Sequence, residues 1–245
     1  MPTFFVASDA VAPPTIRIPG PLLHHLRQSL RLQVGETLSV TDDQGNRYQT
    51  EISQVTGQAL VGHILTMTSA PPKAGPSMIL AQSLLKGEKM DWVIQKATEL
   101  GIDRIVPVLA AHSVVRPLGE RIERQRARWE RIALEAAQQC ERRFVPGIGQ
   151  PATVAELLSR SKSAASKILL AERSTGASLL TVSLPRTGDD VWLLVGPEGG
   201  WEEEEVAQSL QHGFTAVTLG PLILRAETAA IAAISVLQSR LGGLG

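Results

Sequence analysis

The sequence predicts an α/β fold in which a parallel sheet, covered by helices, follows a small β-rich domain. From residue 77 onward, apolar strand segments alternate with amphipathic helices, a pattern typical of a parallel sheet buried on both faces. Residues 1–68 instead favour short strands around one helix. Residues 69–76 form a Pro/Gly-rich connector without apolar periodicity. We therefore expect two domains, at 1–70 and 77–245.

Composition limits the class of protein. The chain has 245 residues, 43% of them hydrophobic, which is enough to bury a sizeable core. Its single cysteine, Cys140, cannot form an intrachain disulfide, as expected in a reducing cytoplasm. The first residues lack the features of a signal peptide, and no apolar run approaches the roughly 20 residues that span a bilayer. We expect a cytoplasmic protein without a membrane segment.

Charge is distributed unevenly along a chain whose formal net charge is zero. Residues 73–150 carry thirteen Lys and Arg against nine acidic residues, whereas residues 1–72 and 151–245 each have a small acidic excess. Zero net charge argues against a protein that simply coats nucleic acid. A basic middle fits a defined RNA footprint, and it equally fits a solvated helix.

The first domain reads as a small barrel with one helix. The expected strands are residues 3–6, 15–18, 36–41, 48–55 and 59–67. Residues 42–46 (DDQGN) predict a hairpin turn between two of them. Apolar spacing predicts a helix over 21–30, where Arg27 and Arg31, four residues apart, share a face and could reach one run of phosphates. The alternative is an ordinary solvent-facing side of that helix.

The second domain alternates strands and helices. The expected strands are 78–82, 104–109, 168–172, 191–195 and 214–219, and the expected helices are 91–100, 122–143, 153–161 and 227–241, with a further helix beginning at the acidic run 202–205. Gly101 is expected to cap one helix, and Thr153 with Glu156 to form a capping box. Residues 174–190 read as turn-rich linkage.

Two lysines stand where the first of these strands ends. Lys86 and Lys89 could meet RNA or a ligand phosphate, or could pair with Glu88 or Asp91. In the long helix over 122–143, mixed charges at helical spacing predict ion pairs on a solvated surface.

Two late turns have the same shape. The strand at 191–195 runs into Gly-Pro-Glu-Gly-Gly at 196–200, and the strand at 214–219 runs into Gly220-Pro221. Glycine lets the backbone approach a ligand closely, and small ligands bind at the carboxyl ends of strands in open α/β sheets. The dinucleotide fingerprint and the phosphate loop are both absent, which disfavours a Rossmann-type enzyme or an NTPase. The five histidines show no zinc-type spacing, so we expect no metal.

These turns also carry a resemblance. Gly-Pro-Glu-Gly-Gly followed by Leu-Gly-Pro-Leu-Ile-Leu-Arg-Ala-Glu-Thr-Ala at 219–229 resembles the signature of the SPOUT methyltransferases, in particular the branch that methylates N3 of a uridine in bacterial small-subunit rRNA. The resemblance implies a cytoplasmic homodimer that uses S-adenosylmethionine. It further implies a knotted C-terminal α/β domain behind a PUA-like, RNA-binding β-barrel.

The resemblance places the cofactor at the two turns. S-adenosylmethionine has no phosphate, so its site needs backbone polar groups and an apolar sleeve more than positive charge. The implied cofactor-binding residues are Leu194, Gly196, Pro197, Glu198, Gly199, Gly200, Leu219, Gly220, Ile223, Leu224 and Arg225.

Catalytic roles follow from the same resemblance. Arg225 is expected at the reacting edge, where its guanidinium could stabilise the uridine anion. Glu198 and Glu227 are candidate bases or orienting groups. The alternatives are a hydrogen bond within the turn for Glu198 and a helix N-terminal charge for Glu227.

The family's RNA-facing helix resembles the stretch that contains Glu135 and Gln138, two possible contacts to the target base. Relatives commonly have a basic residue where this chain has Thr3, so we expect the amino-terminal RNA contact to be weaker, or to come from Arg17 or Arg47. Two other functions remain open: a SPOUT enzyme acting on another base or a ribose 2′-hydroxyl, and a non-catalytic rRNA-binding assembly factor.

Overall fold

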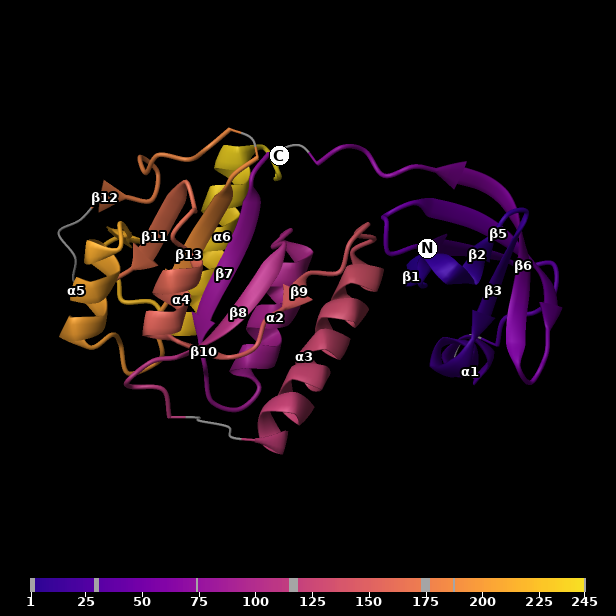
Figure 1. Cartoon of the computed structure of the whole chain (residues 1–245), viewed down its shortest axis with the longest axis horizontal. Helices are drawn as coiled ribbons and strands as arrows, with labels where there is room; N and C mark the ends of the chain where they lie inside the picture. The colour runs from indigo at the N-terminus through magenta and orange to yellow at the C-terminus, as the bar shows by residue number, and fades with distance from the viewer. Residues whose placement is uncertain are drawn as a thin grey trace. The chain divides into compact units, whose positions relative to one another are not determined.

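The computed structural model describes residues 3–28, 31–73, 75–114, 119–172, 177–186 and 188–244. The chain divides into two compact units (Figure 1). Unit 1 consists of Met1–Pro72 together with Ala137–Phe144, and unit 2 consists of Lys73–Ala136 together with Val145–Gly245.

Unit 1 is built on a six-stranded sheet in the order β1-β4-β5-β6-β3-β2. Its elements are β1 (Thr3–Phe5), η1 (Ser8–Ala10), β2 (Val11–Ala12), β3 (Thr15–Pro19), α1 (Gly20–Gln28), β4 (Thr37–Thr41), β5 (Arg47–Val55) and β6 (Ala59–Thr68). All pairings are antiparallel except β1 with β4. Alternate residues such as Ile16 and Ile18 point inward and share one apolar core with Leu26 of α1. The expected β-rich domain with one helix is confirmed.

The predicted hairpin is held by Asp42. Its carboxylate accepts hydrogen bonds from the backbone N–H groups of Gln44 and Asn46, the Asn46 side chain and the Tyr48 hydroxyl, at 2.8–3.0 Å. Asp42 is only 3% exposed. Burial raises its pKa, but the hydrogen bonds to Asn46, Tyr48 and Gln44 together outweigh burial and leave the pKa below its ordinary value.

One predicted helix face is wrong. Helix α1 spans Gly20–Gln28, and Arg31 beyond it has a left-handed backbone with φ of 52°. Arg27 and Arg31 therefore do not share a helix face. The side chain of Arg27 lies outside the described residues, while Arg31 is exposed. Thr3 is buried and its hydroxyl bonds to that of Thr41, so the side chain at this position points into unit 1 rather than toward solvent.

The segment 137–144 joins unit 1 through arginine contacts. Arg143 donates to the carbonyl oxygens of Gly45 (2.9 Å) and Thr68 (3.2 Å), and Arg47 donates to the carbonyl of Glu141 (2.7 Å). Helix α3 (Glu120–Gln139) ends four residues earlier than predicted, and Glu141 has a φ of 55°. These contacts hold the segment in a non-helical path, and they give Arg47 a structural role.

Unit 2 is built on an eight-stranded sheet in which the strand pairings among the described residues are all parallel. Seven strands follow the order β10-β8-β7-β13-β11-β14-β12, and β9 pairs with β8. The strands are β7 (Ser77–Ser83), β8 (Arg104–Leu109), β9 (Gly147–Ile148), β10 (Ala152–Thr153), β11 (Ser166–Leu170), β12 (Ala177–Ser178), β13 (Asp190–Val195) and β14 (Thr215–Thr218). The predicted parallel sheet is confirmed.

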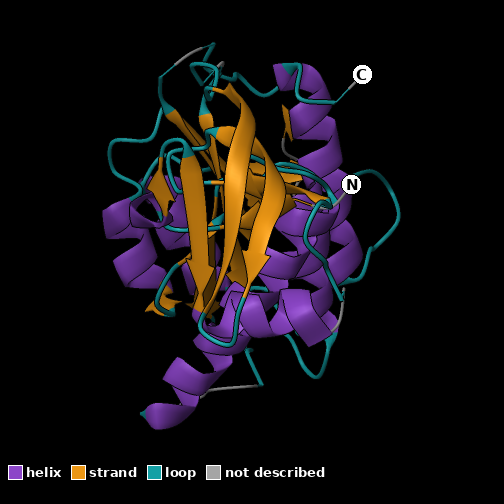
Figure 2. Cartoon of the chain, turned by 90° about the vertical axis from the view of Figure 1, so that its right-hand side faces the viewer, coloured by secondary structure: helices purple, strands orange, loops and turns teal. Residues whose placement is uncertain are grey.

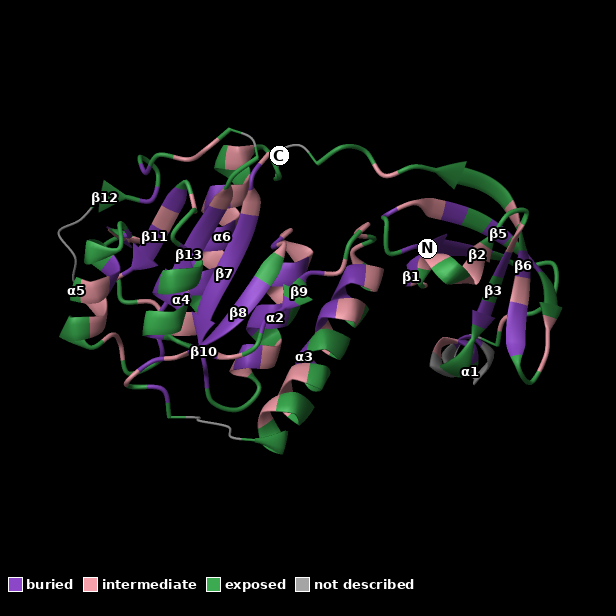
Figure 3. Ribbon diagram, viewed as in Figure 1, coloured by how far each residue is buried: buried purple, intermediate pink, exposed green. Residues whose placement is uncertain are grey.

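Helices cover both faces of this sheet. Figure 2 colours the helices and strands of the whole chain. They are α2 (Lys89–Glu99), α4 (Val154–Arg160), α5 (Glu203–Gln211) and α6 (Ala226–Leu241), together with α3. Helices α2, α3 and α6 pack on one face and share a core with Leu80 and Leu193. Helices α4 and α5 pack on the other face, with Ile79 and Leu194. Because neighbouring strand residues face opposite sides, β7 and β13 are buried along nearly their whole length (Figure 3).

Local signals account for several helix ends. Thr153 caps α4 and Glu156 completes the predicted capping box. Gly101, with φ of 88°, follows α2 as expected. The acidic run at 202–205 begins α5 as expected: Glu202 is the N-cap, the next three acids lie in the first turn, and Glu202 and Glu205 form a second capping box. In the predicted linkage at 174–190 the structure adds the two-residue strand β12, which pairs with β14.

Candidate functional site

A cavity of about 670 Å³ opens where three neighbouring strands of unit 2 end. Strands β13, β11 and β14 are adjacent in the sheet and parallel, so their carboxyl ends meet at one edge. The lining residues are Leu170, Ala171, Glu172, Val195, Gly196, Pro197, Gly199, Gly200, Trp201, Glu203, Val206, Ala207, Leu210, Val217, Thr218, Leu219, Leu222, Ile223, Leu224, Ala226 and Ala229. Both late turns therefore line the same cavity.

The first turn, residues 196–200, is shaped by its glycines. The Gly200 N–H donates to the carbonyl of Pro197 at 3.0 Å, and Gly200 has a φ of 75°, which L side chains rarely adopt. A Cβ at Gly199 would lie 2.9 Å from the Cβ of His112. The turn therefore requires glycine at 200 for its backbone conformation and at 199 for close packing against His112.

The second turn supplies apolar side chains. Gly220 has a φ of 119° and bends the chain after β14. Leu222 and Ile223 follow, and they are 76% and 67% exposed although they line the cavity. These two side chains form an exposed apolar rim at the cavity. Helix α6 then begins, with Arg225 at its N-cap.

Sequence reasoning missed the third wall of the cavity. Leu170 and Glu172 at the end of β11, and the first turns of α5, also line it. Trp201 ties these parts together because its indole N–H donates to the carbonyl of Leu170 at 2.9 Å. The available signal was the expected strand at 168–172, but chain order did not reveal that β11 lies between β13 and β14.

The chemistry of the lining selects a class of ligand. Glu172 and Glu203 are its only charged side chains, and none of the described lining residues is Lys, Arg or His. The remainder is mostly aliphatic, with backbone N–H and C=O groups exposed at the glycines. A phosphate group would find no counter-charge among these residues. The lining suits a neutral or cationic ligand with an apolar body.

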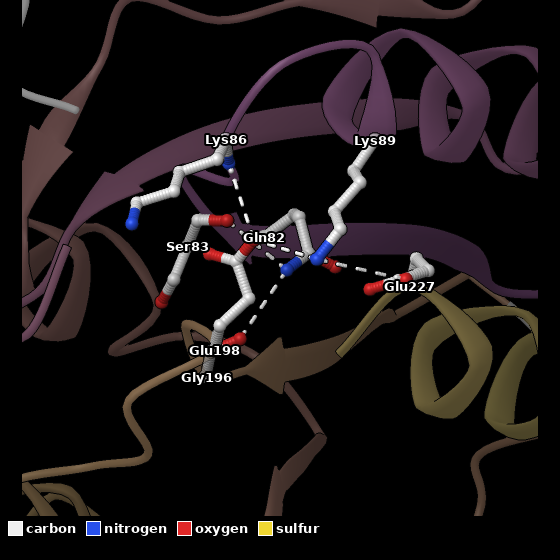
Figure 4. Close-up of polar contacts among 7 residues, drawn as sticks. All are labelled: Gln82, Ser83, Lys86, Lys89, Gly196, Glu198 and Glu227. Carbon is white, nitrogen blue, oxygen red and sulfur yellow. Dashed lines mark hydrogen bonds and ion pairs between the residues drawn. The ribbon is translucent and has the colours of Figure 1, made fainter. Parts of the chain in front are cut away.

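A polar cluster lies beside the first turn, as Figure 4 shows. The ammonium group of Lys89 is 2.9 Å from Oε1 of Glu198 and 3.8 Å from Oε1 of Glu227. The backbone N–H of Lys86 donates to the same oxygen of Glu198 at 3.3 Å. The lysine at 89 therefore pairs with these two carboxylates, whereas Asp91 binds Arg128.

The contacts of Glu198 affect its acid–base character. Burial raises its pKa, but the hydrogen bonds and charge of Lys89 and the N–H of Lys86 outweigh burial and lower the pKa below its ordinary value. A carboxylate with a lowered pKa is a weak base. The contacts of Glu198 favour an orienting role over that of a base.

Buried polar atoms support the turn from behind. Gln82 is 0% exposed, and its side-chain N–H₂ donates to the carbonyls of Ser83 (3.1 Å) and Gly196 (3.5 Å). Oε1 of Gln82 and Oε2 of Glu227 are buried, and neither has a hydrogen-bond partner in the part of the chain that the structure describes. Glu227 is not among the described residues that line the cavity.

Four predicted cofactor-binding residues adjoin the cavity lining without being part of it. Leu194 is buried within β13, and among the described residues Leu194, Glu198, Gly220 and Arg225 are not part of the cavity lining. Arg225 is exposed next to lining residues on both sides.

The predicted contacts on α3 differ in exposure. Glu135 is exposed and lies 3.7 Å from Arg131, in agreement with the ion pairs predicted for this helix. Gln138 is half-buried.

The described residues contain no group of three or more His, Cys, Asp or Glu placed to hold a metal ion. Over the same ranges, none of the helices has the length and apolar character needed to cross a membrane.

Two family models match the chain. Residues 73–238 match the RNA methyltransferase domain, and residues 18–65 match the RNA methyltransferase PUA domain. A curated relative, ribosomal RNA small subunit methyltransferase E of Bacillus subtilis, is 31% identical over 231 residues, which cover 92% of this chain and 90% of the relative.

Solved structures agree with these matches. Ribosomal RNA small subunit methyltransferase E from Neisseria gonorrhoeae, bound to S-adenosyl methionine, is 30% identical, with a TM-score of 0.86 over 98% of both chains. A protein from Legionella pneumophila in complex with the bound cofactor SAM is 28% identical, with a TM-score of 0.87 over 98% of both chains. The chain therefore belongs to the RNA methyltransferase family that includes ribosomal RNA small subunit methyltransferase E.

Proposed function

We propose that this protein transfers a methyl group from S-adenosylmethionine to N3 of a uridine in small-subunit rRNA. The observation that supports this most strongly is the cavity that both late turns line at the carboxyl edge of the sheet. The relatives that share this fold over nearly the whole chain are named for small-subunit rRNA methylation, and one was solved with the methyl donor bound.

The cavity fits this donor. S-adenosylmethionine combines a flat adenine, an apolar thioether arm and positive charge, and it has no phosphate. The aliphatic side chains of Leu219, Ile223 and Leu224 offer an apolar sleeve, and the backbone at Gly196 offers polar groups for the adenine edge. Glu172 and Glu203 give the lining a negative charge that suits a sulfonium ligand. When bound, the donor supplies an electrophilic methyl group.

Arg225 is the residue that we place at the reacting edge. It is exposed at the N-cap of α6, between the lining residues Leu224 and Ala226, so its guanidinium can reach a base brought to the mouth of the cavity. Attack by N3 requires transfer of the N3 proton to a base, and until the methyl group is transferred the resulting negative charge is shared between N3 and the carbonyl oxygens of uridine. A fixed guanidinium beside such an oxygen stabilises that charge and lowers the barrier. N3 lies on the Watson–Crick edge, so the base must be unpaired to reach the site.

The remaining parts of the proposal concern assembly. We propose that the domain at 1–70 contacts rRNA through its barrel, and that the domain at 77–245 forms a trefoil knot whose deep turns are those at 196–200 and 219–225. Exposed Leu222 and Ile223 suit a homodimer interface next to the cofactor. Lys86, Arg27, Arg31, Glu135 and Gln138 remain candidate RNA contacts, and the cytoplasm remains the proposed location.

The test is a methylation assay with defined substrates. Purified protein is incubated with labelled S-adenosylmethionine and, separately, with free small-subunit rRNA, a partly assembled subunit and a complete subunit. Nucleoside mass spectrometry then identifies the product. We expect N3-methyluridine from at least one substrate. Binding of the donor without any methylated nucleoside would instead indicate an assembly factor, and a methylated ribose or another methylated base would refute the proposed position.

A further inference from the structure

Lys89 joins the two turns that line the cavity. It is the first residue of α2, and its ammonium group lies between Glu198 of the first turn and Glu227 in the first helical turn of α6, directly after the second turn (Figure 4). Its distance to Glu198 (2.9 Å) is that of a charge-assisted hydrogen bond, and its distance to Glu227 (3.8 Å) is that of an ion pair. One cation thus pairs with carboxylates from two segments that are separate in the sequence.

The first turn is anchored on its side away from the cavity. The carboxylate of Glu198 accepts hydrogen bonds from the ammonium group of Lys89 and the backbone N–H of Lys86. The carbonyl of Gly196 accepts one from the buried side-chain amide of Gln82. Gly196, Pro197, Gly199 and Gly200 line the cavity, whereas Glu198 does not. The carboxylate therefore acts on the cavity through the backbone of the turn, by fixing where its neighbours lie.

Removing the cation changes the balance of charge. Glu227 is 14% exposed, and one of its oxygens is buried without a partner among the described residues. Without Lys89, two carboxylates would lie close together with no counter-ion. Like charges at this range repel, and a partly buried carboxylate is costly when unpaired. The turn at 196–200, which is part of neither a helix nor a strand, is the part best able to move away.

We infer that Lys89 is a positioning residue for cofactor binding: it holds the two turns at the separation that the cavity needs, and it does so by pairing with Glu198 and Glu227. This inference rests on the proposed function, because it concerns the same cavity. The other role considered for Lys89 is a direct contact with RNA. Loss of a positioning residue should weaken binding of the cofactor, whereas loss of an RNA contact should weaken binding of RNA.

The experiment compares Lys89→Met with Lys96→Met. Lys96 lies on the same helix with a similar exposed fraction and is paired with Glu99 at 2.8 Å, so it controls for the loss of one lysine charge and one ion pair from α2. Binding of S-adenosylmethionine is measured by calorimetry without RNA, and KM for rRNA and kcat are measured separately. We expect Lys89→Met to weaken cofactor binding about tenfold or more, Lys96→Met to bind as wild type, and Lys89→Arg to recover most of the affinity, since a guanidinium can also bridge carboxylates.

A double variant tests whether Lys89 acts through Glu198. If it does, Lys89→Met combined with Glu198→Gln binds the cofactor no more weakly than the weaker single variant, because the second change removes a charge that the first left unpaired. Independent, multiplying losses would overturn the inference. Normal cofactor binding by Lys89→Met, with a raised KM for rRNA, would overturn it in favour of an RNA contact.

A last measurement separates this inference from the proposed function. If the wild-type protein binds no S-adenosylmethionine, the proposed function fails. Hydrogen exchange alone then tests whether Lys89 holds the two turns in place. Faster exchange at residues 199–200 and 226–229 in Lys89→Met than in Lys96→Met supports a positioning role for Lys89, and equal exchange overturns that role.

Discussion

Replacing Gly200 by alanine tests whether the shape of the first turn builds the cavity. Gly200 has a φ of 75°, and a Cβ added there meets no atom within 4 Å. The substitution therefore adds backbone strain without a steric clash. The left-handed conformation costs a non-glycine residue about 1–2 kcal/mol, so the cofactor-free variant lowers its free energy when the turn relaxes to another conformation.

The strain energy then reduces the free energy of cofactor binding. If the cofactor requires the turn in its present shape, binding must restore the left-handed backbone at position 200. A cost of 1–2 kcal/mol corresponds to an affinity about 5–30 times weaker. Calorimetric titration with S-adenosylmethionine measures this directly, and thermal unfolding measures any cost to the fold itself.

Gly242 provides a matched control. It also has a φ of 75° with no atom within 4 Å of an added Cβ, but it ends helix α6 and does not line the cavity. We expect Gly242→Ala to lower the melting temperature while leaving cofactor affinity unchanged. Wild-type affinity in Gly200→Ala, with a loss of stability equal to that of Gly242→Ala, would refute the idea that this turn shapes the site.

Three further predictions follow from the same structure. Gly199→Val should abolish cofactor binding, because its Cβ would lie 2.9 Å from that of His112 and force the turn to move; calorimetry giving wild-type affinity would contradict this. Arg225→Ala should remove methylation while leaving cofactor binding and the proposed dimer intact, as measured by nucleoside mass spectrometry, calorimetry and light scattering; retained activity would remove Arg225 from the mechanism. Asp42→Asn should destabilise unit 1 by about 2 kcal/mol, because a charged acceptor of several hydrogen bonds is lost. Since the pKa of Asp42 is lowered by folding from its ordinary value of 3.8, its contribution is present above that pH and is lost as the pH falls through the folded pKa. Urea unfolding should therefore show a smaller difference between wild type and variant at pH 3 than at pH 7, and an equal difference at both would contradict the assignment.

Local signals predicted much of the fold. The hairpin at 42–46 and the caps at Gly101 and Thr153 lie within a few residues of the bonds that they make, so the sequence window contains both partners. The end of α3 was missed because it depends on distant contacts. Arg47 lies 94 residues away in the sequence and donates a hydrogen bond to the carbonyl of Glu141, so no local pattern could predict that contact.

Part of the site could also be predicted from local sequence: two walls of the cavity were expected and the third was not. Glycine-rich turns after apolar strands indicated two walls of the cavity, because the turn chemistry is local. The wall from Leu170 to Glu172 depends on the strand order β13-β11-β14, which chain order does not give. The partner of Lys89 was also missed, since Glu198 lies 109 residues away and the nearer acids, Glu88 and Asp91, were the obvious alternatives.

The most direct test of the account is calorimetric titration of S-adenosylmethionine into the wild-type protein and into Ala229→Phe. Ala229 lines the cavity from α6, so the larger side chain should occupy the proposed site. We predict one cofactor bound per wild-type chain and none by Ala229→Phe at the same concentrations. Equal binding by both proteins, or no binding by the wild type, would contradict the assignment of this cavity.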